Sequence, residues 1–185
     1  MKSQMKNIYQ IDQSGKVEQT QRHSVVACTN GETMIVLLPA KEKRRLQQWF
    51  RLVGAPTLFV DTTFAIMVYL SIKNLLKKTT RFIIDIEYQG RTKVIEDMIA
   101  RLTQTKLTIS WKSIGKTSKA HDVAYNALRK REKVKKTSAE VVWKLAIIAS
   151  RRLATKIAGG RLTQEWLPGD RRSAPASKKN IAKRK

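Results

Sequence analysis

Apolar and polar positions alternate in short runs through the first forty residues, which is typical of β-strands. The runs are 6–12 (KNIYQID), 23–29 (HSVVACT) and 33–38 (TMIVLL). The dipeptide Asn30-Gly31 separates the last two runs, and it tolerates the positive φ angles of a tight hairpin turn. The sequence therefore predicts three antiparallel strands at the start of the chain.

The pattern then changes to helical spacing. After Pro39, apolar side chains fall three or four residues apart, which predicts a first helix over about 40–53. A second, strongly apolar helix is expected after Pro56, with Asp61 or Thr62 as its N-terminal cap. The apolar face expected for this second helix consists of Phe64, Met67, Val68, Ile72 and Leu75.

Strands and helices alternate in the next part of the chain. Strands are expected over 81–88 (RFIIDIEY) and 107–114 (LTISWKSI), and helices over about 92–102 and 119–131. Three antiparallel strands followed by this alternation predict an α/β fold with a mixed sheet and crossover connections.

A basic extension follows. The capping-box spacing from Thr137 to Glu140 begins a helix that Gly159 stops. Its expected apolar stripe consists of Val141, Leu145, Ile148 and Ala149. Beyond Pro168 the chain has almost no large apolar residues, so it is expected to be disordered when free. The predicted organisation is a domain over 1–136, a basic amphipathic helix over 137–160 and a flexible basic tail over 161–185.

Charge identifies the class of partner. The chain has 38 lysine and arginine residues against 14 acidic ones, a formal net charge of +24 over 185 residues. Residues 1–129 hold 21 basic and 10 acidic side chains, and residues 130–185 hold 17 and 4, so both parts are basic. Cations at this density gain affinity for phosphate backbones by releasing condensed counterions. The expected partner is DNA, RNA or a hybrid of the two.

Other features narrow the location of the protein. Cys28 is a single cysteine and has no internal disulfide partner, and the first ten residues lack the apolar run of a secretory signal. The longest apolar stretch, residues 57–72, contains Asp61 and is shorter than the roughly 20 residues that a membrane-spanning helix needs. We expect a cytoplasmic protein without a membrane span.

Acidic residues recur at particular places in this order of elements. The first strand ends in Asp12-Gln13-Ser14-Gly15, the fourth strand contains Asp85-Ile86-Glu87, and the last helix of the alternating part contains His121-Asp122. This succession resembles the ribonuclease H-like superfamily of nucleases, resolvases and transposases over about residues 6–131. The first helix departs from the ribonuclease H type, because Glu42 lies near its start rather than in its interior. That departure favours a resolvase-like arrangement.

The resemblance implies a metal site for phosphodiester hydrolysis. Asp12, Glu87 and Asp122 would be hard oxygen ligands for Mg²⁺ or Mn²⁺, with Asp85 as a fourth ligand or a structural neighbour. His121 would assist proton transfer or orient the scissile phosphate. Each carboxylate alone also fits a simpler role, since isolated acidic residues end strands, cap helices or face solvent.

Basic side chains near these positions are candidates for contacts with nucleic acid. One group flanks the turn between the last strand and the following helix, where lysines and backbone amides can hold a phosphate. It consists of Lys112, Lys116 and Lys119. A second group lies on the helix of the extension and consists of Lys144, Arg151 and Arg152. A solvated basic face is the alternative for both groups.

These observations predict a divalent-metal-dependent nuclease acting on DNA, RNA, a hybrid or a junction. The main alternative is a non-catalytic nucleic-acid-binding or ribonucleoprotein component on the same fold. A protein that attaches to anionic membrane surfaces ranks below both, because it leaves the acidic positions unexplained. A homodimer is compatible with the sequence, although no isolated apolar seam demands one.

Overall fold

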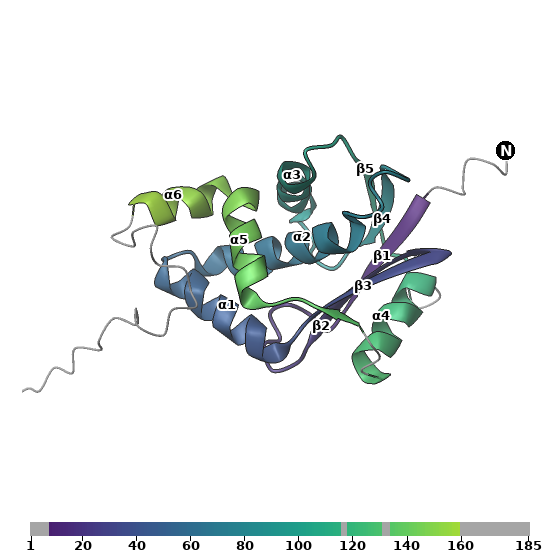
Figure 1. Ribbon diagram of the computed structural model, residues 1–185, viewed down its shortest axis with the longest axis horizontal. Helices are drawn as coiled ribbons and strands as arrows, with labels where there is room; N and C mark the ends of the chain where they lie inside the picture. The colour runs from purple at the N-terminus through teal and green to yellow at the C-terminus, as the bar shows by residue number, and fades with distance from the viewer. Residues whose placement is uncertain (1–7, 116–117, 131–133, 160–185) are drawn as a thin grey trace, which may run out of the picture.

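A computed structural model describes residues 8–115, 118–130 and 134–159 of the protein. Its centre is a six-stranded mixed sheet (Figure 1). The strands are β1 (Ile8–Ser14), β2 (Ser24–Asn30), β3 (Glu32–Leu38), β4 (Arg81–Asp85), β5 (Thr108–Lys112) and β6 (Lys135–Lys136).

The strand order is β5-β4-β1-β2-β3-β6. β1, β2 and β3 pair antiparallel through two consecutive connections, whereas β4 and β5 run parallel to β1. The predicted α/β fold with a mixed sheet is confirmed, and the topology is consistent with the ribonuclease H-like arrangement. The sequence did not reveal β6, because two lysines pair their backbone with β3 and have no apolar pattern.

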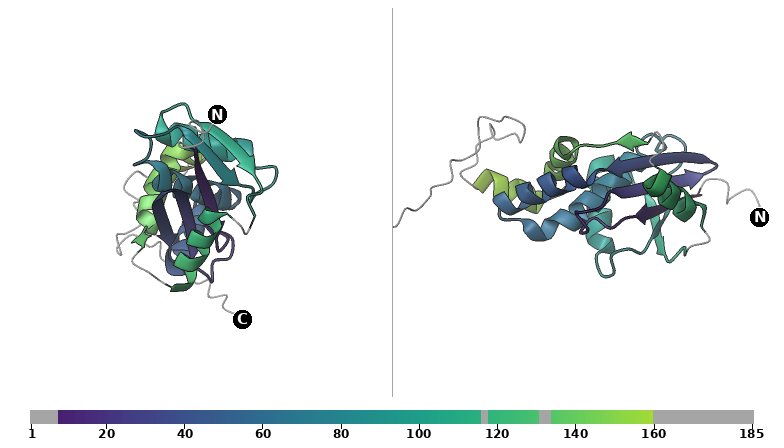
Figure 2. Two further views of the ribbon diagram at one scale, coloured as in Figure 1. Left: turned by 90° about the vertical axis from the view of Figure 1, so that its right-hand side faces the viewer. Right: turned by 90° about the horizontal axis from the view of Figure 1, so that it is seen from below.

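Helices cover both faces of the sheet (Figures 1 and 2). On one face α2 (Phe59–Ile72) packs against β2 and β3, and it is in turn covered by α1 (Ala40–Leu52), α3 (Thr92–Thr103) and α5 (Ala139–Ala149). On the other face α4 (Lys119–Lys130) packs on β1, β2 and β3. A second, smaller core lies under α4, where alanines contact β2 and β3.

The position of α2 differs from the prediction in two ways. Its side chains are buried on nearly all sides rather than along one face, because neighbouring helices surround it. It also begins earlier, at Phe59, directly after a short 3₁₀ helix over Pro56–Leu58. Asp61 therefore lies in the first turn rather than at the cap, and its carboxylate accepts a hydrogen bond from Arg91 (2.6 Å).

The helix predicted over 137–160 is divided into two, α5 and α6 (Arg151–Gly159). Ser150 has an extended backbone between them, and its hydroxyl accepts a hydrogen bond from the Leu153 backbone N–H (3.2 Å), as a cap of α6 does. The buried face of α5 also differs from the predicted stripe. Val141 and Ile148 are exposed, whereas Trp143 packs edge-on against aromatic rings of α1.

α5 is thus anchored in the same core as the helices that precede it. Glu42 in α1 reinforces this contact, because its carboxylate accepts a hydrogen bond from the Ala139 backbone N–H at the start of α5 (2.9 Å). Arg45 bridges Glu42 and Glu140 with two ion pairs. The predicted tail over 161–185 lies outside the described residues.

A buried lysine fixes the connection between β1 and β2. Lys43 of α1 has no exposed surface, and its ammonium donates to the carbonyl oxygens of Lys16 and Gln19 (2.9 Å each) and to the Ser24 hydroxyl (2.7 Å). Burial lowers the pKa of Lys43 to about 8. Its three hydrogen bonds hold the loop that follows Asp12 against α1.

We therefore expect Lys43→Met to destabilise the protein by about 3 kcal/mol, because it leaves buried acceptors without a donor. Urea unfolding followed by circular dichroism measures the change. Lys41→Met is the matched control, since Lys41 is exposed on the same helix; its effect is expected to stay within about 0.5 kcal/mol. Equal effects of the two substitutions would contradict the role of Lys43.

Candidate metal centre

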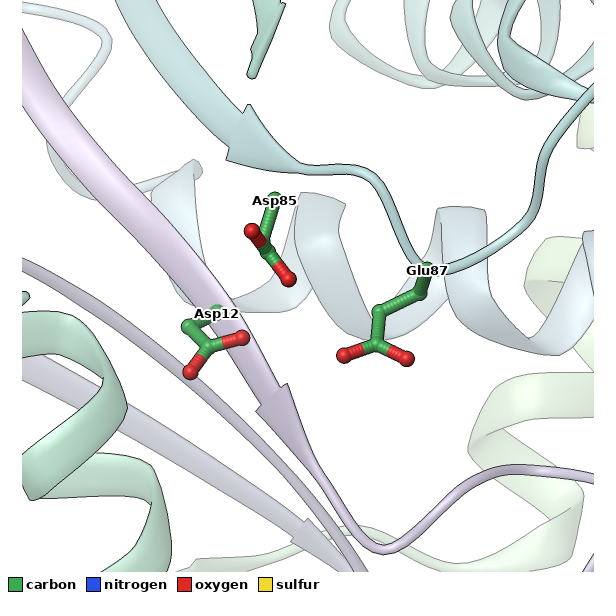
Figure 3. A group of neighbouring side chains, drawn as sticks. All are labelled: Asp12, Asp85 and Glu87. Atoms are coloured by element: carbon green, nitrogen blue, oxygen red, sulfur yellow. The ribbon is translucent and has the colours of Figure 1, made fainter. Parts of the chain in front are cut away.

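Three carboxylates meet where β1 and β4 end (Figure 3). The two strands pair in parallel with Ile11 beside Ile84, so the next residues, Asp12 and Asp85, emerge side by side. Glu87 comes from the turn that immediately follows β4. One carboxylate oxygen from each residue lies within 4.8 Å of the others, which is a spacing that a single cation can bridge.

Hydrogen bonds fix the two aspartates. Asp12 is 3% exposed; its Oδ1 accepts from the Gln13 backbone N–H (2.7 Å), and its Oδ2 lies 2.9 Å from His121 Nδ1. Oδ1 of Asp85 accepts from the Ile114 backbone N–H (2.8 Å). The hydrogen bond between Ile114 and Asp85 connects the end of β4 to the segment between β5 and α4. Both side chains are thus oriented before any ligand arrives.

Glu87 belongs to a turn that is held from two sides. The next residue, Tyr88, accepts a hydrogen bond from the Val17 backbone N–H (3.2 Å) and donates one to Glu18 (3.1 Å). Its ring packs edge-on against Phe64 of α2. Tyr88 therefore joins the loop after β4 to the loop after β1, the two loops that flank the carboxylates.

Gly15 makes the turn after Asp12 sterically feasible. Its φ is +75°, a region that favours glycine, and a β-carbon at this position would lie 2.3 Å from the carbonyl oxygen of His23. This close approach gives a structural reason for the glycine of the Asp12-Gln13-Ser14-Gly15 sequence. The sequence pattern singled out this glycine only by its place after a strand.

The electrostatics of the group favour a cation. Burial is the main cause that raises the pKa of Asp12, and the negative charge of Asp85 raises it further. Burial likewise raises the pKa of Glu87, followed by the charges of Asp12 and Asp85, with partial compensation from Lys16. Charged carboxylates in this place repel one another, and a hard divalent ion such as Mg²⁺ or Mn²⁺ removes that repulsion. The donor set, all oxygen, fits these ions.

The structure gathers some of the predicted site residues and not others. Asp12, Asp85 and Glu87 form the group, and His121 contacts it through Asp12. Asp122 has an exposed side chain and is not a member of the carboxylate group found among the described residues. Its role as a ligand stays a prediction. Helix α4 turns His121 rather than Asp122 toward β1.

The predicted basic residues are spread over two regions. Lys112 and Lys119 line one hollow in the protein surface. Lys116 lies outside the described residues. The remaining three are exposed on α5 and α6, in the helical layer on the far side of the sheet from α4; they are Lys144, Arg151 and Arg152.

The sequence did not identify several residues that shape the site. Tyr88 and Lys43 act through contacts to the loop after β1, and these contacts join segments that are distant in the sequence. Glu42, which the sequence placed near the start of the first helix, is engaged with α5. The only local sign of such residues in the sequence is an ionisable side chain among apolar neighbours, and this sign is weak.

Comparisons with protein-family models, curated proteins and solved structures find no match for this chain. Among the described residues, no helix is long and apolar enough to cross a membrane.

The raised pKa values predict how stability depends on pH without metal. An acid whose folded pKa is raised holds its proton longer when folded, so stability falls as pH rises from about 4 through the folded pKa. In EDTA, the wild-type protein should therefore lose stability toward pH 7 more than Asp12→Asn does. Thermal melts at pH 4 to 7 check this, and parallel curves for the two proteins would contradict it.

Proposed function

We propose that the protein is a divalent-metal-dependent nuclease that hydrolyses phosphodiester bonds in nucleic acid. The observation that carries the proposal is the convergence of Asp12, Asp85 and Glu87 at the ends of two adjacent strands. The strand order, consistent with the ribonuclease H-like topology, supports it.

The charge distribution also supports a metal-dependent nuclease. Three carboxylates gather in a chain whose formal net charge is +24, and without a cation they would repel a phosphate. A bound divalent ion turns that repulsion into attraction, so binding of the substrate would depend on the metal at this place and on lysine and arginine elsewhere.

Each residue has a distinct part in the proposed reaction. Asp12, Asp85 and Glu87 would hold Mg²⁺ or Mn²⁺, and the ion would supply stabilisation of negative charge on the phosphate and activation of water. His121 is partly exposed beside Asp12, and its ring stacks on that of Tyr125. Asp12 fixes the orientation of the imidazole through Nδ1. The proposed role of His121 is to move a proton or to orient the scissile phosphate.

One observation favours the alternative, a non-catalytic nucleic-acid-binding protein. Glu42 of α1 is engaged with α5 and Arg45, so α1 contributes no carboxylate to the group among the described residues. In this alternative, the three carboxylates serve only to bind an ion that secures the fold. This alternative predicts tight, salt-sensitive binding of nucleic acid and no metal-dependent cleavage.

Cleavage assays with matched variants separate the two functions. We expect Asp12→Asn, Asp85→Asn and Glu87→Gln each to lower the rate of cleavage about 100-fold or more, because each removes a charged ligand. Asp122→Asn tests the ligand role that the sequence predicted for this residue; because its exposed carboxylate lies outside the group, we expect its rate to stay within about threefold of wild type.

The substrates are labelled duplex DNA, RNA–DNA hybrid and four-way junction, each with Mg²⁺, Mn²⁺ or EDTA. Cleavage in Mg²⁺ or Mn²⁺ but not in EDTA would support the nuclease. If wild-type protein binds all three substrates and cleaves none, the catalytic proposal is wrong for them. A loss of activity in Asp122→Asn as large as that in Asp12→Asn would instead place Asp122 among the ligands.

A further inference from the structure

A hollow of about 560 Å³ lies on the face of the sheet that carries α4. It begins beside the first residues of β1 and reaches the end of β5 and the start of α4. Its lining combines apolar, amide, hydroxyl and ammonium groups: Ile8, Gln10, Thr29, Asn30, Gly31, Ile83, Lys112 and Lys119.

The hollow and the carboxylates share this face. Side chains two residues apart on a strand lie on the same face of the sheet. Gln10 therefore shares a face with Asp12 on β1, and Ile83 shares it with Asp85 on β4. Lys112 on β5 pairs directly with Asp85 in the parallel register. A ligand lying in the hollow would therefore adjoin the carboxylate group without crossing to the other side of the sheet.

α4 covers only part of this face among the described residues. It packs mainly on β1, β2 and β3, so that on this side Ile83 and Asp85 of β4 are partly buried and β5 is exposed. On β5 the burial alternates: Ile109 and Trp111 pack against the main core, while Ser110 and Lys112 are exposed. Ser110 pairs with Ile83, a residue that lines the hollow, so the exposed face of β5 continues its floor.

The chemistry of the lining indicates its ligand. Lys112 and Lys119 approach from β5 and from the first residue of α4, and neither forms an ion pair within the described residues. Two such ammonium groups suit phosphates. Ile8 and Ile83 offer apolar surface to the face of a base, while the partly exposed Gln10 offers an amide to its edge.

We propose that this hollow binds a single-stranded segment of the nucleic acid next to the scissile phosphate, and this inference rests on the proposed function. Bases in a duplex are stacked and paired, so the apolar floor can contact a base only where the strand is unpaired. A hollow of about 560 Å³ is large enough for roughly one or two nucleotides. The substrate class is thus a duplex with a single-stranded arm or a splayed end.

The first test measures binding separately from cleavage. Labelled duplexes with no arm, a two-nucleotide arm or a six-nucleotide arm are titrated in EDTA, and affinity is followed by fluorescence anisotropy. We expect the wild-type protein to bind armed duplexes more tightly than the blunt one. Lys112→Glu combined with Lys119→Glu should weaken binding of armed duplexes at least about tenfold more than it weakens binding of the blunt duplex.

The control is a double variant with the same change in net charge at lysines outside the hollow. Lys106→Glu combined with Lys156→Glu alters exposed lysines beside α3 and on α6, and its effect should be equal for blunt and armed duplexes. If the Lys112 and Lys119 variant also weakens both kinds of duplex equally, the inference is wrong. This outcome is distinct from failure of the proposed function, which would show as absence of cleavage in Mg²⁺ or Mn²⁺.

A second test does not depend on charge. Ser110→Cys places a thiol on the open face of β5, and an azidophenacyl label there should cross-link to the single-stranded arm. Native Cys28 does not compete for the label, because it is fully buried and burial raises its pKa to about 12. Lys156→Cys is the control site. Cross-links from Ser110→Cys that fall only in the paired region would overturn the inference.

Discussion

The parallel pairing of β1 with β4 is the constraint on which the rest of the structure depends. It sets Ile11 beside Ile84 in the buried face, and the following residues, Asp12 and Asp85, then emerge together at the carboxyl ends of the strands. A shift by one residue would turn one of these carboxylates to the opposite face. The apolar core therefore fixes the polar site, because the alternation that buries Ile11 also orients Asp12.

The carboxylate group is costly for the metal-free fold. Burial and mutual repulsion raise the pKa values of Asp12 and Glu87, so the charged forms are destabilised in the native state. Surrounding contacts maintain the arrangement: Lys43 holds the loop after β1, and Tyr88 joins this loop to the one after β4. A site that is kept at such a cost is expected to bind a cation.

The sequence predicted the carboxylates of the site better than it predicted the residues and helices around them. Asp12, Asp85 and Glu87 lie in or just after strongly apolar strands, and the resemblance to the ribonuclease H-like superfamily singled them out; the structure brings them together at adjoining strand ends. The sequence did not predict which face of α4 lies against the sheet. That face consists of small buried residues, Ala120, Ala124 and Ala127. Alanines give a weak hydrophobic pattern. For this reason the sequence did not show that His121 contacts Asp12 while the side chain of Asp122 is exposed.

Long-range contacts explain the other differences. The burial of Lys43 follows from acceptors in the loop after β1 and at the start of β2. α2 is buried on nearly all sides largely because of α3 and α5, which come later in the chain. Ser150 interrupts the last helix through a capping bond that the apolar spacing does not reveal. The exposed part of the sheet beside α4 likewise depends on which strands that helix covers. This is decided by tertiary packing and cannot be predicted from the pattern of apolar residues.

The most direct test of the metal centre is a crystal structure of the protein soaked in Mn²⁺, with an anomalous difference map recorded near the manganese absorption edge. We predict a peak within coordination distance of Asp12, Asp85 and Glu87. A map without a peak at these three residues, from crystals in which they are ordered, would contradict the account.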